Sequence, residues 1–427
     1  MATTTQYEAV PALAGEAPSR AGTVVMKFGG TSVADTEHIK AVARRLVAAR
    51  EAGNRVVAVL SAMGDTTDEL VRLANEVSHR PAPRELDMLI SVGERVSCAL
   101  AAMAIHDLGH QAISLTGSQA GIVTDTMHGK AKIVDVRARR IHEALDGGKI
   151  VVVAGFQGVS TTFDVTTLGR GGSDTTAVAL AAALGADICE IYTDVEGVYT
   201  ADPRIVPEAR KLDTVTYEEM LDLAAGRAKV LMLRSVEYAR NHGVPLHVRS
   251  SFSAAEGTRI VSHEESLERA IISGIAHDTS EAKATILGVP DQPGIAARVF
   301  RLLADAGVNV DMIVQNVSAA GHTDISFTLP NDDVPVAERI LQDLAGEIGA
   351  AGVTCDPDIA KVSLIGAGMK SHPGVAADMF DALAEAGVNI EIISTSSIRV
   401  SCVVRAADVE RAVRAVHERF GLAVGGS

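Results

Sequence analysis

The sequence contains no tryptophan, and only 3% of its 427 residues are aromatic. A hydrophobic core must therefore be aliphatic, and with 47% hydrophobic residues the chain can build several such cores. Ala-rich helices packed on Val- and Ile-rich strands are typical of α/β proteins. The length of the chain predicts roughly two to four domains.

The chain also lacks an excess of positive charge, since its formal net charge is −15. This argues against a nucleic-acid partner and an anionic membrane surface, although local Lys and Arg residues can still bind an anionic substrate. The four cysteines (Cys98, Cys189, Cys355 and Cys402) are far apart and form no CxxC motif. We therefore expect buried free thiols in a reducing cytosol, and no metal site.

Membrane-targeting features are expected to be absent as well. We expect no apolar run as long as a membrane span. Residues 1–22 have neither a basic start nor an apolar centre, so we interpret them as a flexible tail and not as a signal peptide. These features predict a cytoplasmic protein.

From Thr23 to about Ser253, β-rich runs alternate with helical stretches. The predicted strands are Thr23–Phe28, Val56–Leu60, Ile150–Ala154, Ile188–Tyr192 and Pro245–Val248. The predicted helices are Asp35–Glu51, Asp65–Val77, Pro83–Ile105, Ile133–Leu145, Asp174–Leu184 and Tyr217–Leu223. This alternation predicts a mostly parallel sheet covered on both faces, with ligands at the carboxyl ends of its strands.

The last third of the chain contains an internal repeat. Pro293–Phe300 and Leu303–Val310 match Pro373–Phe380 and Leu383–Ile390 at a constant offset. Each copy reads as a strand, a Pro-Gly turn, a helix, a Gly-Val-Asn turn and further strands. One such unit has a thin core and an exposed sheet edge, so we expect the two copies to pack together.

Two glycine-rich segments carry the chemistry. Lys27-Phe28-Gly29-Gly30-Thr31-Ser32 follows a predicted buried strand and precedes a helix, so its amides can bind a phosphate beside a lysine. It is not a GxxxxGK[ST] loop, and alone it is also compatible with a tight βα turn. The second segment, Gly169–Thr176, places backbone amides at the start of a helix beside Arg170, whose planar guanidinium group suits a carboxylate. Asp174 is predicted to cap this helix.

Three weaker segments point to the same chemistry. Thr193–Arg204 is an acidic loop with a tyrosine after a strand, which suits a nucleotide, although alone it is only a polar loop. Gly226–Val230 contains Lys229, otherwise an ordinary surface lysine. Glu94 lies on an apolar helix, where a buried carboxylate needs a cationic partner such as an ammonium group.

Taken together, these motifs resemble the aspartate kinase family. The resemblance runs from Val25 to about Leu422, and it also includes Ser61–Gly64, Thr66–Thr67, Gly93–Glu94, Ala228–Val230 and Arg249–Ser251. It is strongest to the lysine- and threonine-regulated type of high-G+C Gram-positive bacteria. It implies ATP-dependent phosphorylation of the L-aspartate side chain to 4-phospho-L-aspartate, the first step of the aspartate-derived amino-acid pathway.

The resemblance also implies a domain organisation. A tail (1–22) would precede an amino-acid-kinase domain with a three-layer α/β/α fold (23–253). A linker (254–282) would lead to two ferredoxin-like βαββαβ ACT domains (283–350 and 351–427). The ACT pair would bind an amino-acid effector (lysine, threonine or both) and form a homo-oligomer. An internally initiated regulatory subunit would need a GTG or TTG start, because no Met lies between Met232 and Met312.

The family implies roles for individual residues. The two lysines, Lys27 and Lys229, would neutralise the transferred phosphoryl group, and Asp174 would orient Lys27. The residues expected to hold aspartate are Thr31, Ser61, Thr66, Glu94, Arg170 and Ser173, with Glu94 on its ammonium and Arg170 on its α-carboxylate. The residues expected to hold ATP, which would bring its own Mg²⁺, are Lys27, Phe28, Gly29, Gly30, Gly171, Gly172, Thr193, Asp194, Tyr199, Arg204, Lys229 and Val230. No general base is needed, because an aspartate side chain with a pKa of about 3.9 is already ionised.

The implied effector residues are Asp291, Pro293, Gly294, Ile295, Ala296, Asn309, Asp311 and Gln315 in the first copy, and Pro373, Gly374, Asn389 and Ile390 in the second. Each Pro-Gly is also compatible with a simple turn before a helix. The sequence departs from the family in two places: Ser397 replaces a usual glutamate, and the loop Ser318–His322 is short. Our hypothesis is that feedback inhibition is weakened or altered.

Two alternative functions are weighed against this one. The first is a kinase for another acyl acceptor, such as glutamate or N-acetylglutamate, and the ACT pair with Glu94 and Arg170 argues against it. The second is an amino-acid sensor with an inactive kinase domain. The intact set of Lys27, Glu94, Arg170, Asp174 and Lys229 argues against the sensor.

Overall fold

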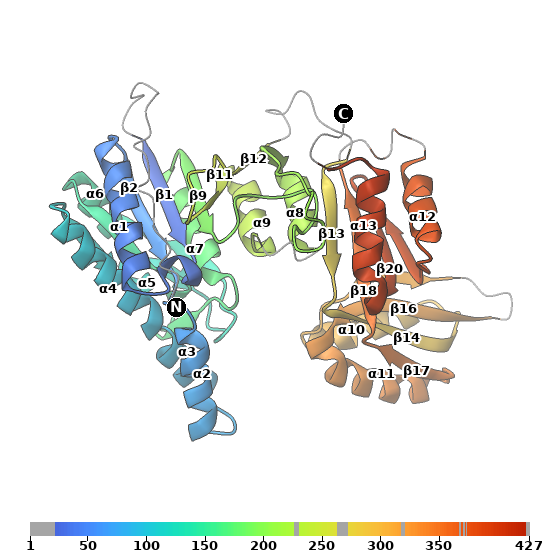
Figure 1. Cartoon of the computed structure of the whole chain (residues 1–427). Coiled ribbons are helices and arrows are strands. Elements are labelled where there is room, and N and C mark those ends of the chain that lie inside the picture. Colours follow the sequence, from blue (N-terminus) through green and yellow to red (C-terminus); the bar gives the residue numbers. More distant parts are fainter. Residues whose placement is uncertain are drawn as a thin grey trace, which may run out of the picture. The chain divides into compact units, whose positions relative to one another are not determined.

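The computed structural model describes residues 22–225, 230–262, 272–316, 321–366, 369, 372 and 374–423. These form two compact units. Of the described residues, the first unit, unit 1, contains residues 22–198, Lys211–Ala224 and residues 230–262. The second, unit 2, contains Tyr199–Arg210, Ala225 and the described residues from 272 onward. Figure 1 labels the helices and strands of both units.

Unit 1 is built on an eight-stranded sheet in the order β10-β12-β11-β9-β1-β2-β6-β3. All neighbouring strands are parallel except β11 and β12. The strands are β1 (Thr23–Phe28), β2 (Arg55–Leu60), β3 (Ala112–Leu115), β6 (Ile150–Ala154), β9 (Ile188–Thr193), β10 (Thr214–Thr216), β11 (Leu246–Ser250) and β12 (Thr258–Val261). The predicted mostly parallel sheet is therefore confirmed.

Helices cover this sheet on both faces, as expected for parallel strands (Figure 1). Helix α1 (Thr36–Glu51) begins at Asp35, whose carboxylate accepts hydrogen bonds from the amides of Glu37 and His38. It packs with α4 (Val92–Asp107) against β1, β2 and β6, and α7 (Gly172–Leu184) contacts β1, β2 and β9. The other helices of unit 1 are η1 (Gly30–Val33), α2 (Thr66–Val77), α3 (Pro83–Ile90), α5 (Gly117–Ala120), α6 (Arg139–Asp146), α8 (Tyr217–Ala225) and α9 (Leu233–His242).

Two predicted helices differ from the structure. The single helix predicted over 83–105 is divided into α3 and α4 at Ser91. The helix predicted over 133–145 is wrong at its start, because Ile133–Val136 forms strand β5 and α6 begins only at Arg139. The β-branched residues of this run pair with β4 (Ile122–Thr124) in a small sheet, and this tertiary pairing outweighs the helical pattern. That sheet has the order β5-β4-β7-β8, with β7 (Gln157–Ser160) and β8 (Val165–Thr167).

The expectation that no apolar stretch reaches the length of a membrane span is also wrong by length and composition. Pro83–Asp107 is 25 residues long and apolar enough in composition to cross a membrane, but half of its most apolar window is buried within the fold. In α4, Cys98, Ala101 and Ile105 pack in the core against β1, β2 and β6. The apolar composition of this stretch is therefore that of a core helix.

Unit 2 contains two four-stranded antiparallel sheets, one for each copy of the repeat. The first copy consists of β14 (Glu281–Pro290), α10 (Ile295–Asp305), β15 (Asp311–Gln315), β16 (His322–Pro330), η3 (Asn331–Asp333), α11 (Val334–Ile348) and β17 (Gly352–Asp356). The second consists of β18 (Ile359–Ile365), α12 (Val375–Glu385), β19 (Ile392–Thr395), β20 (Arg399–Arg405), η5 (Ala406–Asp408) and α13 (Val409–Arg419), and β13 (Gly274–Asp278) completes its sheet. The repeat and its ferredoxin-like pattern are confirmed.

The sheets do not follow the predicted domain boundaries. Strand β13 falls within the predicted linker 254–282, but it pairs with β18 of the second copy. Strand β17 falls within the predicted second domain, but it pairs with β14 of the first copy. The first copy is therefore inserted between β13 and the rest of the second sheet.

Unit 2 also takes in a segment of the predicted kinase domain. Ala201, Ile205 and Val206 lie in the same buried cluster as residues of β18, β20 and α13. The hydroxyl of Thr200 lies 3.0 Å from His417 Nε2 and donates to the carbonyl oxygen of Leu422. Tyr199–Arg210 is thus part of the core of unit 2.

The prediction of buried free thiols is confirmed for three of the four cysteines. Cys98, Cys189 and Cys402 are buried, whereas Cys355 is half-buried. Burial raises the pKa of each of these thiols above its ordinary value. All four therefore remain in the protonated, unreactive form near neutral pH.

Candidate active site

Four central strands of unit 1 end side by side. Phe28 of β1 is in register with Leu60 of β2 and Tyr192 of β9, and Leu60 is in register with Ala154 of β6. The segments that follow are Gly29–Gly30, Ser61–Gly64, Gly155–Phe156 and Thr193–Asp194. Five residues predicted to bind ligand therefore lie at the carboxyl edge of one parallel sheet, the usual ligand position in such folds: Gly29, Gly30, Ser61, Thr193 and Asp194.

Lys27 and Asp174 form an ion pair at this edge. Lys27 Nζ lies 2.5 Å from Asp174 Oδ1, and the side chains are 11% and 9% exposed. Lys27 comes from β1 and Asp174 from the first turn of α7. The predicted pairing of Asp174 with Lys27 is therefore present. The predicted capping role is wrong, because the residue at the helix start is Gly171 and no side chain caps it.

The first glycine-rich loop packs closely on the turn after β2. A Cβ atom at Gly30 would lie 3.2 Å from the carbonyl oxygen of Ala62 and 3.3 Å from that of Gly64. The amide of Gly29 donates to the carbonyl of Tyr192 at 3.4 Å, so this amide is already engaged in a long hydrogen bond. Gly30 begins the short helix η1, whose first amides have no acceptor within the helix. The sequence predicts that these amides lie near the start of α1, but in the structure they open the short helix η1.

The second glycine-rich loop leads into α7, a helix of 13 residues. Gly171 has φ of 72°, and a Cβ atom there would lie 2.0 Å from Cγ of Met232. Only glycine fits such a position. Arg170, the residue that precedes Gly171, is exposed. The loop therefore presents a guanidinium group beside the amino end of a helix, an arrangement that attracts anions.

Glu94 is buried near the same edge, with 3% of the residue exposed. Burial raises the pKa of Glu94 to about 7, although the amides of Glu94 and Ala62 donate to the carboxyl group and act in the opposite direction. Its Oε2 has no hydrogen-bond partner among the described residues. A buried carboxyl oxygen without a partner is rare and calls for a donor from a ligand.

The remaining residues predicted to bind aspartate surround this region. Ser173 is buried against Gly155, where an added Cβ atom would lie 2.7 Å from the serine Oγ. Thr66 lies beside Gly93 and donates from Oγ1 to the carbonyl of Met63 at 2.6 Å. Thr31 is exposed, and Ser61 is half-buried with its amide bonded to the carbonyl of Phe28.

The predicted nucleotide residues are only partly brought together. Thr193 ends β9, and its hydroxyl donates to Asp194 at 3.0 Å. Phe28 is 1% exposed and its ring stacks on that of Tyr192, so its side chain belongs to the core. Val230 is half-buried. Tyr199 and Arg204 belong to unit 2, and Lys229 lies outside the described residues.

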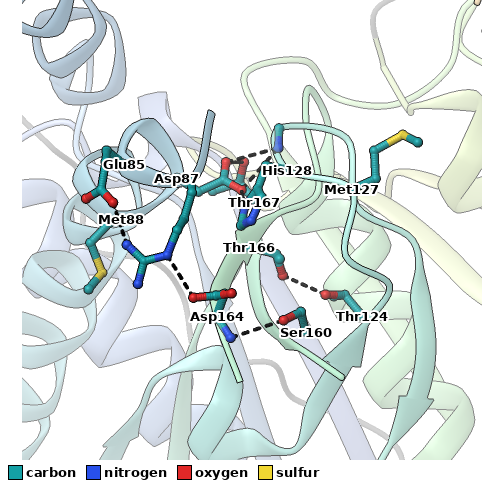
Figure 2. A network of polar contacts seen from close by, with 12 residues as sticks. Glu85, Asp87, Met88, Thr124, Met127, His128, Ser160, Asp164, Thr166 and Thr167 are labelled. Carbon is teal, nitrogen blue, oxygen red and sulfur yellow. Dashed lines mark hydrogen bonds and ion pairs between the residues drawn. The ribbon is translucent and has the colours of Figure 1, made fainter. Parts of the chain in front are cut away.

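A polar network that sequence reasoning missed surrounds Asp87 (Figure 2). Asp87 of α3 is 1% exposed. It accepts hydrogen bonds from Thr167 Oγ1 at 2.5 Å and the amide of Gly129 at 3.1 Å, and His128 Nδ1 lies 2.8 Å from it. The same figure shows Thr124 paired with Thr166, and Asp164, which is paired with Arg84. The only sequence signal was a carboxylate between apolar residues in Leu86–Ile90.

The described effector residues of the prediction lie at the start of α10, in and just before β15, and before α12 and β19. Gly294 and Gly374 start α10 and α12 with φ of 96° and 111°, so each Pro-Gly segment contains a left-handed turn before a helix. Asp311 forms an ion pair with Lys361 of β18. A cavity of about 750 Å³ in unit 2 is lined partly by Ile390 and Glu391. Pro373 and residues 318–320 lie outside the described residues, and Ser397 is exposed between β19 and β20.

The fold and the site define a class: an amino-acid kinase joined to paired ACT domains. Residues 22–250 match the amino acid kinase family, and residues 284–349 and 362–420 match ACT domains. The aspartokinase of Mycolicibacterium smegmatis is 60% identical over 404 residues, which cover 93% of this chain and 96% of the relative. The chain belongs to the aspartokinase family, and its activity is that of an aspartate kinase.

Solved structures agree with this assignment. Aspartokinase III of E. coli in complex with aspartate and ADP (R-state) is 27% identical, with a TM-score of 0.79 and coverage of 93% of this chain and 99% of that one. The same enzyme in complex with lysine and aspartate (T-state) is also 27% identical, with a TM-score of 0.71 and the same coverage.

Proposed function

We propose that the carboxyl edge of the unit 1 sheet transfers the terminal phosphoryl group of ATP to the side-chain carboxylate of L-aspartate, giving 4-phospho-L-aspartate. The observation that carries this assignment is the Lys27–Asp174 ion pair beside two glycine-rich turns. The attacking carboxylate is already ionised near neutral pH, so catalysis requires positioning and charge neutralisation without a general base. Lys27 and Lys229 neutralise the transferred group, and Asp174 holds Lys27 in place.

In this proposal aspartate is recognised through its two α-substituents. Glu94 takes the ammonium group, which its buried oxygen without a partner supports. Arg170 takes the α-carboxylate, for which its planar fork is suited. Thr31, Ser61, Thr66 and Ser173 complete this site. The aspartate and ADP bound to the E. coli relative support both ligand classes.

The nucleotide is held by the amides of Gly30 and Gly171 and by the loop from Thr193. Gly29 and Gly172 shape the two turns, since their own amides donate to the carbonyls of Tyr192 and Gly169. The remaining proposed contacts are with Phe28 through its backbone, Asp194 and Val230. Mg²⁺ is proposed to arrive with ATP as part of the substrate, since nucleotide phosphates usually carry this ion into kinase sites. We place the reaction in the cytoplasm, where ATP and free aspartate are available.

Regulation is proposed to act through unit 2. The T-state complex of the E. coli relative contains lysine, which supports an amino-acid effector here. Lysine, threonine or both are proposed to bind at the segments Asp291–Ala296, Asn309–Gln315, Pro373–Gly374 and Asn389–Ile390, in a homo-oligomer formed through the ACT domains. Because Ser397 and the loop 318–322 depart from the family pattern, inhibition is proposed to be weaker or altered.

A substrate panel tests the proposed acceptor. The purified full chain is incubated with MgATP, hydroxylamine and one of three acids: L-aspartate, L-glutamate or N-acetyl-L-glutamate. Hydroxylamine traps any acyl phosphate as a coloured hydroxamate. The proposal predicts product with L-aspartate at a rate far above the other two. Product with either of the other acids in preference to aspartate overturns the acceptor, and no product with any acid favours a sensor.

A further inference from the structure

Asp87 is not among the proposed ligand contacts, but its buried carboxylate has three protein partners. Its two carboxylate oxygens contact three partners on two different segments: Thr167 at the end of β8, and His128 and Gly129 in the loop between β4 and β5. It is 1% exposed (Figure 2). A buried carboxylate satisfied in this way is costly to disturb and fixes the segments that it joins.

Both segments lie against the second glycine-rich loop. Thr167 is followed directly by Leu168–Gly172, which contains Arg170. The amide of Ala131 donates to the carbonyl of Thr167 at 3.0 Å, and a Cβ atom at Gly169 would lie 3.0 Å from the carbonyl oxygen of Gly129. The loop held by Asp87 therefore forms one wall of the turn that carries Arg170.

A residue of α9, Arg234, also holds this turn by hydrogen bonds. The guanidinium group of Arg234 donates to the carbonyls of Leu168 at 3.0 Å and Ala131 at 2.9 Å. The carboxylate of Asp87 accepts from the hydroxyl of Thr167 and the amide of Gly129. The guanidinium group of Arg234 instead bonds two backbone carbonyls of the same region. Between them the backbone before Arg170 has little freedom to shift.

The helix that carries Asp87 also leads to the ammonium end of the substrate site. Helix α3 ends at Ser91, α4 begins at Val92, and Glu94 lies in the first turn of α4. Gln157 Nε2 donates to the carbonyl of Ser91 at 2.7 Å, which fixes the junction of the two helices. One helix pair therefore connects the group proposed for the ammonium with the loop that carries the group proposed for the α-carboxylate.

We infer that Asp87 is a positioning residue for L-aspartate: by tying α3 to Thr167 and Gly129, it sets where Arg170 meets the α-carboxylate relative to Glu94. Asp87 does not touch the substrate itself, because its oxygens are occupied by protein groups. This inference rests on the proposed role of Arg170.

The first test compares Asp87→Asn with the wild type in steady-state kinetics on the full chain. The amide keeps the shape of the side chain but cannot accept from every present donor. We expect KM for aspartate to rise roughly tenfold or more, because small displacements of positioning groups have effects of this size. KM for ATP should rise by a smaller factor than KM for aspartate, because Gly171 and Gly172, which are proposed to hold the nucleotide, lie beyond Arg170 and farther along the chain from Thr167.

Thr167→Val provides a second route if Asp87→Asn folds poorly. It removes one hydroxyl donor at the root of the turn and leaves the carboxylate with its other partners. Thr166→Val is the matched control, because Thr166 is buried, adjacent on the same strand, and paired with Thr124 Oγ1 at 2.6 Å, away from Asp87. We expect Thr167→Val to raise KM for aspartate and Thr166→Val to leave it unchanged.

A double-mutant cycle separates this inference from the proposed function. If Arg170→Ala raises KM for aspartate, Asp87→Asn in that background should add less than twofold, because Arg170 is no longer there to be positioned. Additive effects, or an equal rise in KM for ATP, overturn the inference. A value of KM for aspartate in Asp87→Asn within twofold of the wild type also overturns it. If instead Arg170→Ala leaves KM for aspartate unchanged, the proposed role of Arg170 fails.

Discussion

Lys361 Nζ lies 3.0 Å from Asp311 Oδ2, and this ion pair joins the second ACT sheet to the first. The same ammonium group lies 2.8 Å from Glu281 Oε1 and is itself almost fully buried, with 3% of the side chain exposed. Asp311 is one of the residues proposed to contact an effector. Any ligand that engages Asp311 must therefore act on the junction between the two repeats.

We expect Lys361→Met to destabilise unit 2 by about 3 kcal/mol, because it leaves the carboxylate of Glu281, which is only 14% exposed, without its cation. Thermal unfolding monitored by circular dichroism measures the loss. Lys283→Met is a suitable comparison, because Lys283 pairs with Glu391 between the same two repeats but is 22% exposed. The expectation is contradicted if Lys361→Met is no more destabilising than Lys283→Met.

The same pair predicts a dependence of stability on pH. Burial tends to raise the pKa of Asp311, but Lys361 outweighs it and holds the pKa below the ordinary value. A lowered carboxyl pKa gives stability that is present above the unfolded pKa of about 3.9 and is lost as the pH falls through the folded pKa. Denaturant midpoints measured from pH 6 downward should therefore fall less steeply in Lys361→Met than in the wild type. Equal slopes would count against this linkage.

The raised pKa of Glu94 predicts how the rate of the reaction depends on pH. Because the pKa of its buried carboxyl is raised to about 7, the ionised form that pairs with an ammonium group is lost as the pH falls below 7. We expect kcat/KM for aspartate to decline about tenfold per pH unit below 7 and to level off above it. In Glu94→Gln the value should be lower overall and this limb should disappear. A limb that persists in Glu94→Gln belongs to another group.

Replacement of Gly171 by alanine is expected to cost free energy of unfolding in two separate ways. Gly171→Ala places a side chain at positive φ, which costs about 1–2 kcal/mol, and adds a clash with Met232. Gly185→Ala is the matched control, because its φ is 56° but an added Cβ meets nothing within 4 Å. We expect both variants to unfold at lower denaturant, and only Gly171→Ala to lose aspartate affinity. Equal kinetics in the two variants would show that the turn tolerates displacement.

The altered effector region predicts weak feedback. Activity is titrated with lysine, with threonine and with an equimolar mixture of the two. Because the family resemblance implies a carboxylate at the position of Ser397, we expect no strong concerted inhibition by the mixture. Restoring the charge with Ser397→Glu should lower the effector concentration needed for half-inhibition. Tight concerted inhibition of the unmodified chain contradicts this hypothesis.

Much of the fold could be predicted because its signals are local. The strands of the large sheet are β-branched runs that end in glycine or polar turns, as in Thr23–Phe28 before Gly29. The pairing of β13 with β18 and of β17 with β14 could not be predicted, because it depends on non-local contacts that sequence repeats do not encode. Ile133–Val136 was misassigned for the same reason, since its partner β4 decides its conformation.

The candidate site was predictable where glycine and charge stand together. The motifs identified Lys27, Asp174 and Glu94, and the family resemblance implied that Asp174 orients Lys27. The structure shows an ion pair between Lys27 and Asp174 and the burial of Glu94. Asp87 was missed because a single carboxylate on an amphipathic helix has the same appearance as a solvent-facing one. The place of Tyr199 in unit 2 was also missed, although the apolar residues Ala201, Ile205, Val206 and Ala209 were visible in the segment after it.

The most direct test of the account is the turnover of Lys27→Ala, measured as aspartyl hydroxamate formed at saturating MgATP and aspartate. The double variant Lys27→Met/Asp174→Asn is measured beside it, because it leaves no unpaired carboxylate, and thermal unfolding verifies that both variants fold. We predict that kcat falls on the order of 10²–10³-fold in both, since a charge that stabilises the transferred phosphoryl group is lost. Turnover within twofold of the wild type in a folded variant would contradict the central claim that Lys27 acts on that group.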